Sequence, residues 1–222
     1  MALNIIKLAD LQTSDIKFSD VRKNTKGGKA VYLNHVAGGK LMLKLPLLRA
    51  PFGLSTFAGD DGKVTSTSLP LSVDNPQAAA KLDEINRAIL DFVHSHCEAI
   101  MGKAMSRETL AEMYKSPFKP STKEGYAPIL NLKVITDPTT GAIKTESYDS
   151  TGNDVALDSL EKGQSVTTLV ELSQIWRTPA GFGATFRVHQ VKFAAANKLP
   201  SRALVDDDEQ SVHTEEGEED SE

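Results

Sequence analysis

The chain has 222 residues, of which 40% are hydrophobic and 25% charged, and its formal net charge is −5. This length can bury the core of one domain with appendages, or of two small domains. No apolar run approaches the roughly 18 residues of a membrane helix. The N-terminal segment reaches Asp10 too early, and lacks the basic leader, for a signal peptide. The single cysteine, Cys97, excludes an internal disulfide framework and a cysteine zinc cluster. We therefore expect an intracellular protein that does not bind membranes.

The negative net charge comes from the C-terminal end of the chain. Ten acidic residues and no Lys or Arg follow position 205: Asp206, Asp207, Asp208, Glu209, Glu215, Glu216, Glu218, Glu219, Asp220 and Glu222. Removing these ten from the 30 acidic residues leaves 20 against 25 basic ones, so a body of charge +5 precedes a tail of charge −10. Like charges repel each other, and the tail has little apolar surface to bury, so we expect it to be disordered. It is either a solubilising appendage or an anion that competes for the basic surface of the body.

Three parts are predicted along the chain. Residues 1–15 show no clear hydrophobic period and are predicted to be a flexible arm. Residues 16–194 carry the strand and helix signals and are predicted to form one domain. Residues 195–222 follow as a linker and the acidic tail, and no internal repeat is present.

Strand signals come first in this domain. Residues 31–36 and 40–48 are separated by Ala37-Gly38-Gly39, which is the spacing of a β-hairpin. In the second segment Leu41, Leu43, Leu45 and Leu47 alternate with Met42 and Lys44, which predicts a buried leucine face. The turn signal Asp60-Asp61-Gly62 then leads into another alternating stretch.

A long helix interrupts the strands. Asn75 is suited to its N-cap and Pro76 to its first turn. Apolar residues recur at helical spacing from Leu82 to Ile100, which predicts a stripe that packs against a sheet. Gly102 weakens or ends this helix. Ser106 is suited to cap a short second helix that runs from Arg107 to Tyr114 and that Pro117 stops.

Strands resume after this helical region. Residues 129–135 alternate, and residues 165–176 and 182–193 are separated by the turn signal Thr178-Pro179-Ala180-Gly181. This order lacks the regular strand–helix alternation of a parallel α/β fold. We predict a mainly β (α+β) fold, an OB-fold-like five-stranded barrel with an inserted long helix, with other α+β arrangements as the alternative.

Residues for catalysis or metal binding are not grouped in the sequence. On a helix His94 and His96 point apart, and only His94 and Cys97 share a face, which is too few ligands for a metal site. Gly27-Gly28-Lys29 has the character of a hairpin turn and lacks the spacing of a phosphate-binding loop. Paired aspartates lie in turns without a neighbouring histidine or nucleophile. We predict no enzyme activity, no metal and no cofactor.

Nucleic-acid binding has more support. Trp176, the only tryptophan, ends a predicted strand beside Arg177. An aromatic ring beside guanidinium groups is a platform for base stacking, at about 1–3 kcal/mol per base. The remaining candidate contacts are Arg187 and Lys192 on the next strand, and a phosphate groove of Lys29, Lys40, Lys44, Arg49 and Lys133. The alternative is that Trp176 belongs to the core and that each lysine is an ordinary surface residue.

Three stretches carry a family resemblance: GGKAVYLNHVAGGKLMLKLPLLRAPFGLS (27–55), SRETLAEMYKSPFK (106–119) with YAPILNLKV (126–134), and IWRTPAGFGATFRVHQVKF (175–193). They resemble the single-stranded DNA-binding proteins of nucleocytoplasmic large DNA viruses, which are distantly similar to that of bacteriophage T7. The resemblance implies an OB-fold that binds single-stranded DNA without sequence preference in viral DNA replication, recombination or repair. It implies no metal or cofactor, and action in the host nucleus or at a cytoplasmic viral replication site.

The resemblance also implies a role for the tail. In the phage relatives the acidic tail covers the DNA groove and docks on replication proteins such as the polymerase or helicase-primase. Those tails end in an aromatic residue, whereas this chain ends Asp220-Ser221-Glu222, so the resemblance supports charge competition more than docking. The oligomeric state, including a homodimer, stays undetermined. A viral structural or histone-chaperone-like protein with an acidic tail is the alternative function.

Overall fold

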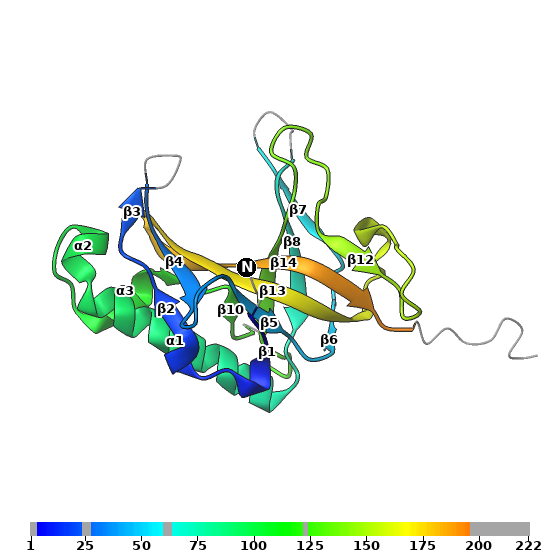
Figure 1. Cartoon of the computed structure of the whole chain (residues 1–222), viewed down its shortest axis with the longest axis horizontal. Helices are drawn as coiled ribbons and strands as arrows, with labels where there is room; N and C mark the ends of the chain where they lie inside the picture. Colours follow the sequence, from blue (N-terminus) through cyan, green and yellow to red (C-terminus); the bar gives the residue numbers. More distant parts are fainter. Residues whose placement is uncertain (1–3, 24–27, 60–63, 122–123, 196–222) are drawn as a thin grey trace, which may run out of the picture.

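The computed structural model describes residues 4–23, 28–59, 64–121 and 124–195. This part of the chain is mainly β-sheet with helices between the early and the late strands, as predicted (Figure 1). The acidic tail and the turn at Asp60-Asp61-Gly62 lie outside the described residues. Within the described ranges, no helix has the length and hydropathy that crossing a membrane requires.

The strands before the helices are β1 (Asn4–Lys7), β2 (Ile16–Phe18), β3 (Arg22–Lys23), β4 (Lys29–His35), β5 (Leu41–Lys44), β6 (Leu48–Arg49), β7 (Ser55–Ala58) and β8 (Val64–Ser72). The helices are α1 (Pro76–Ser95), α2 (Cys97–Met101) and α3 (Arg107–Met113). The later strands are β9 (Tyr114–Lys115), β10 (Phe118–Lys119), β11 (Ile129–Val134), β12 (Glu146–Tyr148), β13 (Ser165–Thr178) and β14 (Gly181–Phe193). Short 3-10 turns lie at Leu8–Asp10, Thr13–Asp15 and Leu157–Ser159.

The hairpin of β13 and β14 is the centre of the sheet. Its two strands pair antiparallel from Val166 and Phe193 to Thr178 and Gly181, and they cross the whole molecule in Figure 1. The other edge of β13 pairs in turn with β6, β5 and β4. Pairing also runs from β6 through β8 and β11 to β14, so these strands and β13 form a closed ring of pairings.

The helices lie along one side of the sheet, below it in Figure 1. The side chain of Asn75 accepts hydrogen bonds from the backbone N–H groups of Gln77 and Ala78, and Pro76 is the first helical residue. The buried face of α1 contains Leu82, Ile85, Ile89 and Val93. Gly102 ends α2 in the left-handed conformation, and Ser106 caps α3. The predicted helix signals are thus confirmed, except that the chain breaks at His96 into α1 and α2.

The N-terminal region differs from its prediction as a flexible arm. Residues 4–7 form β1, which pairs in parallel with β5, and Leu8 and Leu11 are buried in the core. The hydrophobic period is absent because a four-residue strand is followed by irregular turns, so the buried residues of the segment are not regularly spaced. The Nζ of Lys81 on α1 donates to the carbonyl of Leu11, which fixes the segment to the helical layer.

The predicted leucine face is correct for most of its length. Leu41, Leu43 and Leu45 are buried, whereas Leu47 is 59% exposed. The strand stops at Lys44 and a second short strand begins at Leu48, so the alternation does not continue across Pro46. Because Pro46 lacks a backbone N–H, it is disfavoured inside a paired strand.

Candidate nucleic-acid interface

The register of β13 and β14 divides their side chains between two faces. The core face pairs Val170 with Val188, Leu172 with Phe186 and Ile175 with Ala184, all of them buried. Bulges at His189 and Ser173 keep the alternation consistent along both strands. The opposite side, here called the outer face, carries Thr167, Leu169, Glu171, Gln174 and Trp176 from β13, and Gly183, Thr185, Arg187, Gln190 and Lys192 from β14.

Trp176 is half-buried on this outer face, and its indole lies against the backbone of Gly183. A Cβ atom at Gly183 would be 2.5 Å from Cζ2 of the indole and 2.6 Å from the carbonyl oxygen of Lys115. Only a residue without a side chain leaves room for the ring there. The indole therefore lies close against the sheet with part of its surface accessible, which is the arrangement that base stacking requires.

Basic residues share the outer face with the indole. Trp176 pairs with Ala30, which pairs in turn with Arg22 on β3. Arg187 pairs with Lys133 on β11, and Lys133 pairs with Ser68 on β8. Of the residues predicted from the sequence, the structure thus places Trp176, Arg187 and Lys133 on one continuous surface.

Two hollows lie on either side of the hairpin along this surface. The first, the tryptophan hollow, has a volume of about 280 Å³ and is lined by Ser68, Asn131, Lys133, Trp176 and Thr185 among others. The second, the glutamate hollow, has about 440 Å³ and is lined by residues that include Arg22, Tyr32, Lys40, Glu171 and Arg187. Both are shallow and mainly polar, so they suit an extended polar ligand.

Two further aromatic side chains face the same side. Tyr32 on β4 is 37% exposed and lines the glutamate hollow, and Phe57 on β7 is 68% exposed and pairs with Ser66 beside the tryptophan hollow. Figure 1 shows β3–β4 and β7–β8 rising on the same side of the hairpin. Tyr32, Phe57 and Arg22 were not predicted from the sequence. Tyr32 alternates with buried Val31 and Leu33, and this alternation is the sequence signal that could have predicted its exposure.

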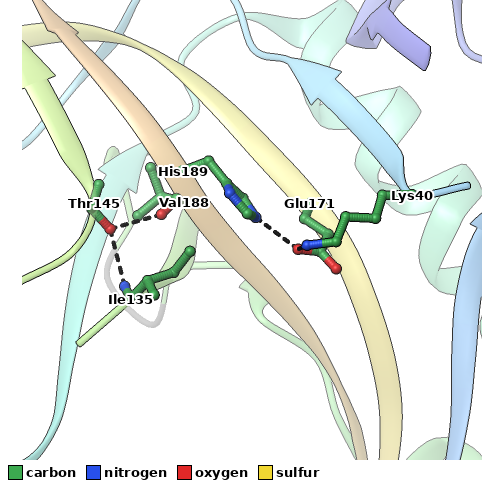
Figure 2. Close-up of polar contacts among 6 residues, drawn as sticks. All are labelled: Lys40, Ile135, Thr145, Glu171, Val188 and His189. Atoms are coloured by element: carbon green, nitrogen blue, oxygen red, sulfur yellow. Dashed lines mark hydrogen bonds and ion pairs between the residues drawn. The ribbon is translucent and has the colours of Figure 1, made fainter. Parts of the chain in front are cut away.

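A buried carboxylate lies at the centre of the outer face. Glu171 Oε2 accepts a hydrogen bond from Lys40 Nζ at 3.1 Å and is 2.6 Å from His189 Nε2 (Figure 2). Burial by itself raises the pKa of Glu171, but the hydrogen bonds from His189 and Lys40 outweigh it and hold the pKa below its usual value. Glu171 is therefore ionised at neutral pH. Lys40, predicted as a phosphate contact, already neutralises this carboxylate.

Thr145 fixes the backbone next to this group. Its hydroxyl donates to the carbonyl of Val188 at 2.8 Å and accepts from the backbone N–H of Ile135 at 3.0 Å (Figure 2). This buried side chain connects the ends of β11 and β12 to β14 at the residue before the His189 bulge. The imidazole is thus held in position from the backbone side.

The depressed pKa of Glu171 makes a prediction for acid stability. A carboxyl group with a lowered folded-state pKa contributes stability above its unfolded-state value and loses it as the pH falls through the folded-state value. We expect Glu171→Gln to be less stable than the wild type at about pH 7, and this difference to shrink at about pH 3. Urea unfolding at both pH values measures it; a constant difference would show that the ionised carboxylate contributes nothing.

Two side chains that were predicted to contact DNA make hydrogen bonds elsewhere in the structure. Arg177 follows Trp176 on the strand, so its side chain points to the opposite face, where its guanidinium donates to the carbonyl of Met101 at 3.2 Å. Lys29 Nζ donates to the carbonyl of Ala99 at 2.6 Å. Both carbonyls are at the C-terminal end of α2, where unpaired carbonyl groups and the helix dipole attract cations. The structure therefore does not bring Arg177 and Lys29 to the outer face.

The remaining predicted residues lie far from Trp176. Lys44 on β5 pairs with Leu169, and Lys192 pairs with Thr167, toward the other end of the hairpin. Arg49 on β6 is exposed and pairs with Ser165 and Ser72. The described residues contain no group of three or more His, Cys, Asp or Glu side chains that would suit a metal ion.

A protein family matches this chain in sequence, and solved structures are similar to it. Residues 60–206, more than half of the chain, match a family described as "Family of unknown function (DUF5871)". No curated protein matches the chain in sequence.

Two phage proteins are similar in structure. The single-stranded DNA-binding protein gp2.5 encoded by bacteriophage T7 is 15% identical with a TM-score of 0.47, over 83% of this chain and 100% of that one. The single-stranded DNA-binding protein from bacteriophage Enc34, in complex with single-stranded DNA, is 10% identical with a TM-score of 0.49, over 83% of this chain and 99% of that one. Likenesses at this level do not transfer a function to the chain.

Proposed function

The chain belongs to this family of unknown function (DUF5871), and we propose that it binds single-stranded DNA, without enzymatic activity, on the outer face of β13 and β14. The observation that carries the proposal is the half-buried indole of Trp176 seated on Gly183, with Arg187 and Lys133 on the same face. An aromatic ring supplies a stacking surface for any base, and the cations supply contacts to phosphates.

The same features favour an unpaired strand over a duplex. A base in a duplex is stacked between its neighbours, so its face is not available to the indole, whereas an unpaired base can turn toward it. Tyr32 and Phe57 offer two more ring surfaces on the same face. Polar side chains such as Ser68, Asn131 and Thr185 are suited to hydrogen bonds with the sugar–phosphate backbone.

Binding to labelled oligo-dT of about 20 nucleotides and to a duplex of equal length tests the proposal. Fluorescence anisotropy at about 0.1 M salt should show at least a tenfold preference for the single strand. Emission from Trp176, the only tryptophan, should be quenched on binding. Binding to histones or other basic proteins with no affinity for either DNA would instead support the acidic-tailed chaperone.

The closed ring of pairings is consistent with an OB-like barrel that carries the site on its outer face. A sequence-independent single-strand binder suits viral DNA replication, where unpaired strands must be protected. The tail, from Asp206 to Glu222, would compete with DNA for the cations of the body and recruit replication proteins when DNA displaces it.

Deleting residues 206–222 should tighten binding to oligo-dT and steepen its dependence on salt. With the tail present, DNA displaces tail contacts that already neutralise the body, so fewer counterions are released on binding. Anisotropy titrations between about 0.05 and 0.2 M salt measure both effects. A full-length control with the ten acidic residues replaced by Asn and Gln should behave like the deletion. If the truncated chain binds no tighter at low salt, the tail does not compete.

A further inference from the structure

The outer face of the hairpin continues well beyond the two hollows beside Trp176. From Gly183, under the indole, to Lys192 is nine residues along β14. At about 3.3 Å per residue this corresponds to about 30 Å. The outer-face residues of β13, from Trp176 to Thr167, stay on one side of the sheet, because the bulges correct the register. A strand bound at Trp176 therefore has a continuous surface along which to extend.

A third hollow, here called the distal hollow, lies at the far end of this surface. It has a volume of about 590 Å³, and Lys44 and Lys192 are on its wall with Leu169, Gln190 and Tyr148. Both lysine side chains are exposed, and within the described residues neither makes an ion pair. Two cations beside apolar and aromatic side chains have the character of a site for phosphates with sugars or bases between them.

Glu171 lies between the tryptophan end and the distal hollow. An isolated carboxylate there would repel a passing phosphate. Its negative charge is instead neutralised by Lys40 Nζ at 3.1 Å and covered by His189 at 2.6 Å, which leaves Arg187, its cross-strand neighbour in the glutamate hollow, as a cation for the ligand. The centre of the surface is thus not an electrostatic barrier between its two ends.

We propose that the distal hollow is a second nucleotide-binding subsite, in which Lys44 and Lys192 bind phosphates of a single strand whose other part stacks on Trp176. The inference rests on the proposed function, because it extends the same surface. Its support is the shared face, the two cations and the covered carboxylate. The occupant is a continuation of the bound strand, and occupation by the acidic tail is the outcome that the test separates from it.

The separation of the two ends sets the length of DNA that can reach both. A strand spans about 3.4 Å per nucleotide when stacked and about twice that when extended. A path of about 30 Å therefore takes roughly five to nine nucleotides. A tetranucleotide at Trp176 cannot reach Lys192, whereas an oligonucleotide of about twelve can occupy both subsites.

The test compares the wild type with the double variant K44Q/K192Q on oligo-dT of about four and about twelve nucleotides. The longer probe should lose about tenfold in affinity at about 0.1 M salt, and the slope of log K against log salt should fall by about 1.4, at about 0.7 per single-strand phosphate contact. The shorter probe should bind unchanged, because 30 Å exceeds the Debye length of about 10 Å. Quenching of the Trp176 fluorescence measures the binding of the short probe directly.

A matched control is R87Q/K103Q, which removes two exposed cations from α1 and from the loop after α2. This control should leave the affinity for both probes unchanged. Equal losses for both probes in K44Q/K192Q, or no loss for either, would overturn the second subsite while leaving the proposed function intact. A gain in affinity in the full chain, with no change in the tail-deleted one, would assign the hollow to the tail. If the wild type binds neither probe, the proposed function itself fails.

Discussion

Replacing Trp176 with alanine is expected to lower the affinity for oligo-dT by roughly 5- to 150-fold, the equivalent of about 1–3 kcal/mol for one stacked base. The indole is held against Gly183 by the sheet, so little of its freedom is lost on binding. Anisotropy of a labelled oligonucleotide measures the loss, because the variant has no tryptophan fluorescence. Trp176→Phe should recover part of the affinity, since a smaller ring stacks less.

The control for this variant is Tyr126→Ala. Tyr126 is 69% exposed but is not part of the lining of the tryptophan, glutamate or distal hollows. Its removal should leave DNA binding unchanged. If Trp176→Ala and Tyr126→Ala have the same affinity as the wild type, then bases do not stack on the indole, and Tyr32 and Phe57 become the rings to replace next.

Substituting Gly183 with alanine is expected to destabilise the fold by about 2–3 kcal/mol, in the upper part of the range for overpacked sites. The added Cβ would meet the Lys115 carbonyl oxygen at 2.6 Å and the Trp176 ring at 2.5 Å. The ring can move, but the carbonyl belongs to β9, which pairs with β14 at this position. Urea unfolding measures the loss, and for a chain of this size we expect a fall in Tm of about 4–12 °C.

A double-mutant cycle separates the two contacts of Gly183. In the Trp176→Ala background the clash with the indole is absent, so Gly183→Ala should cost less there than in the wild type. The remaining cost is the clash with the carbonyl of Lys115. Equal costs in the two backgrounds would contradict the packing of the indole on Gly183.

Much of the fold was predictable because its signals are local. The caps at Asn75 and Ser106 act within a few residues, and Leu130, Leu132 and Val134 alternate with Asn131 and Lys133 as the period of two requires. The N-terminal segment was not predictable in this way. Leu8 and Leu11 are buried by contacts with elements distant in the sequence.

The candidate site was predictable only in part. Trp176, Arg187 and Lys133 could be chosen by residue type, whereas Arg177 and Lys29, predicted for the same surface, contact the end of α2. Their donors bind carbonyls at the end of α2, 76 and 70 residues away in the sequence, and no local pattern reports that approach. Tyr32 and Phe57 were missed because their places beside the two hollows depend on the pairing of β4 with β13 and of β7 with β8, which no local pattern reports.

The closed ring of pairings has a consequence for how the protein is made. The strand β13 joins β4, β5 and β6, which come from the first quarter of the chain, to β14 near its end. Until the ribosome has released this hairpin, the earlier strands lack their central neighbour and expose unpaired edges. Contacts between segments so distant in the sequence slow folding and leave intermediates open to aggregation. Nascent chains are therefore most open to aggregation before the last two strands have been synthesised.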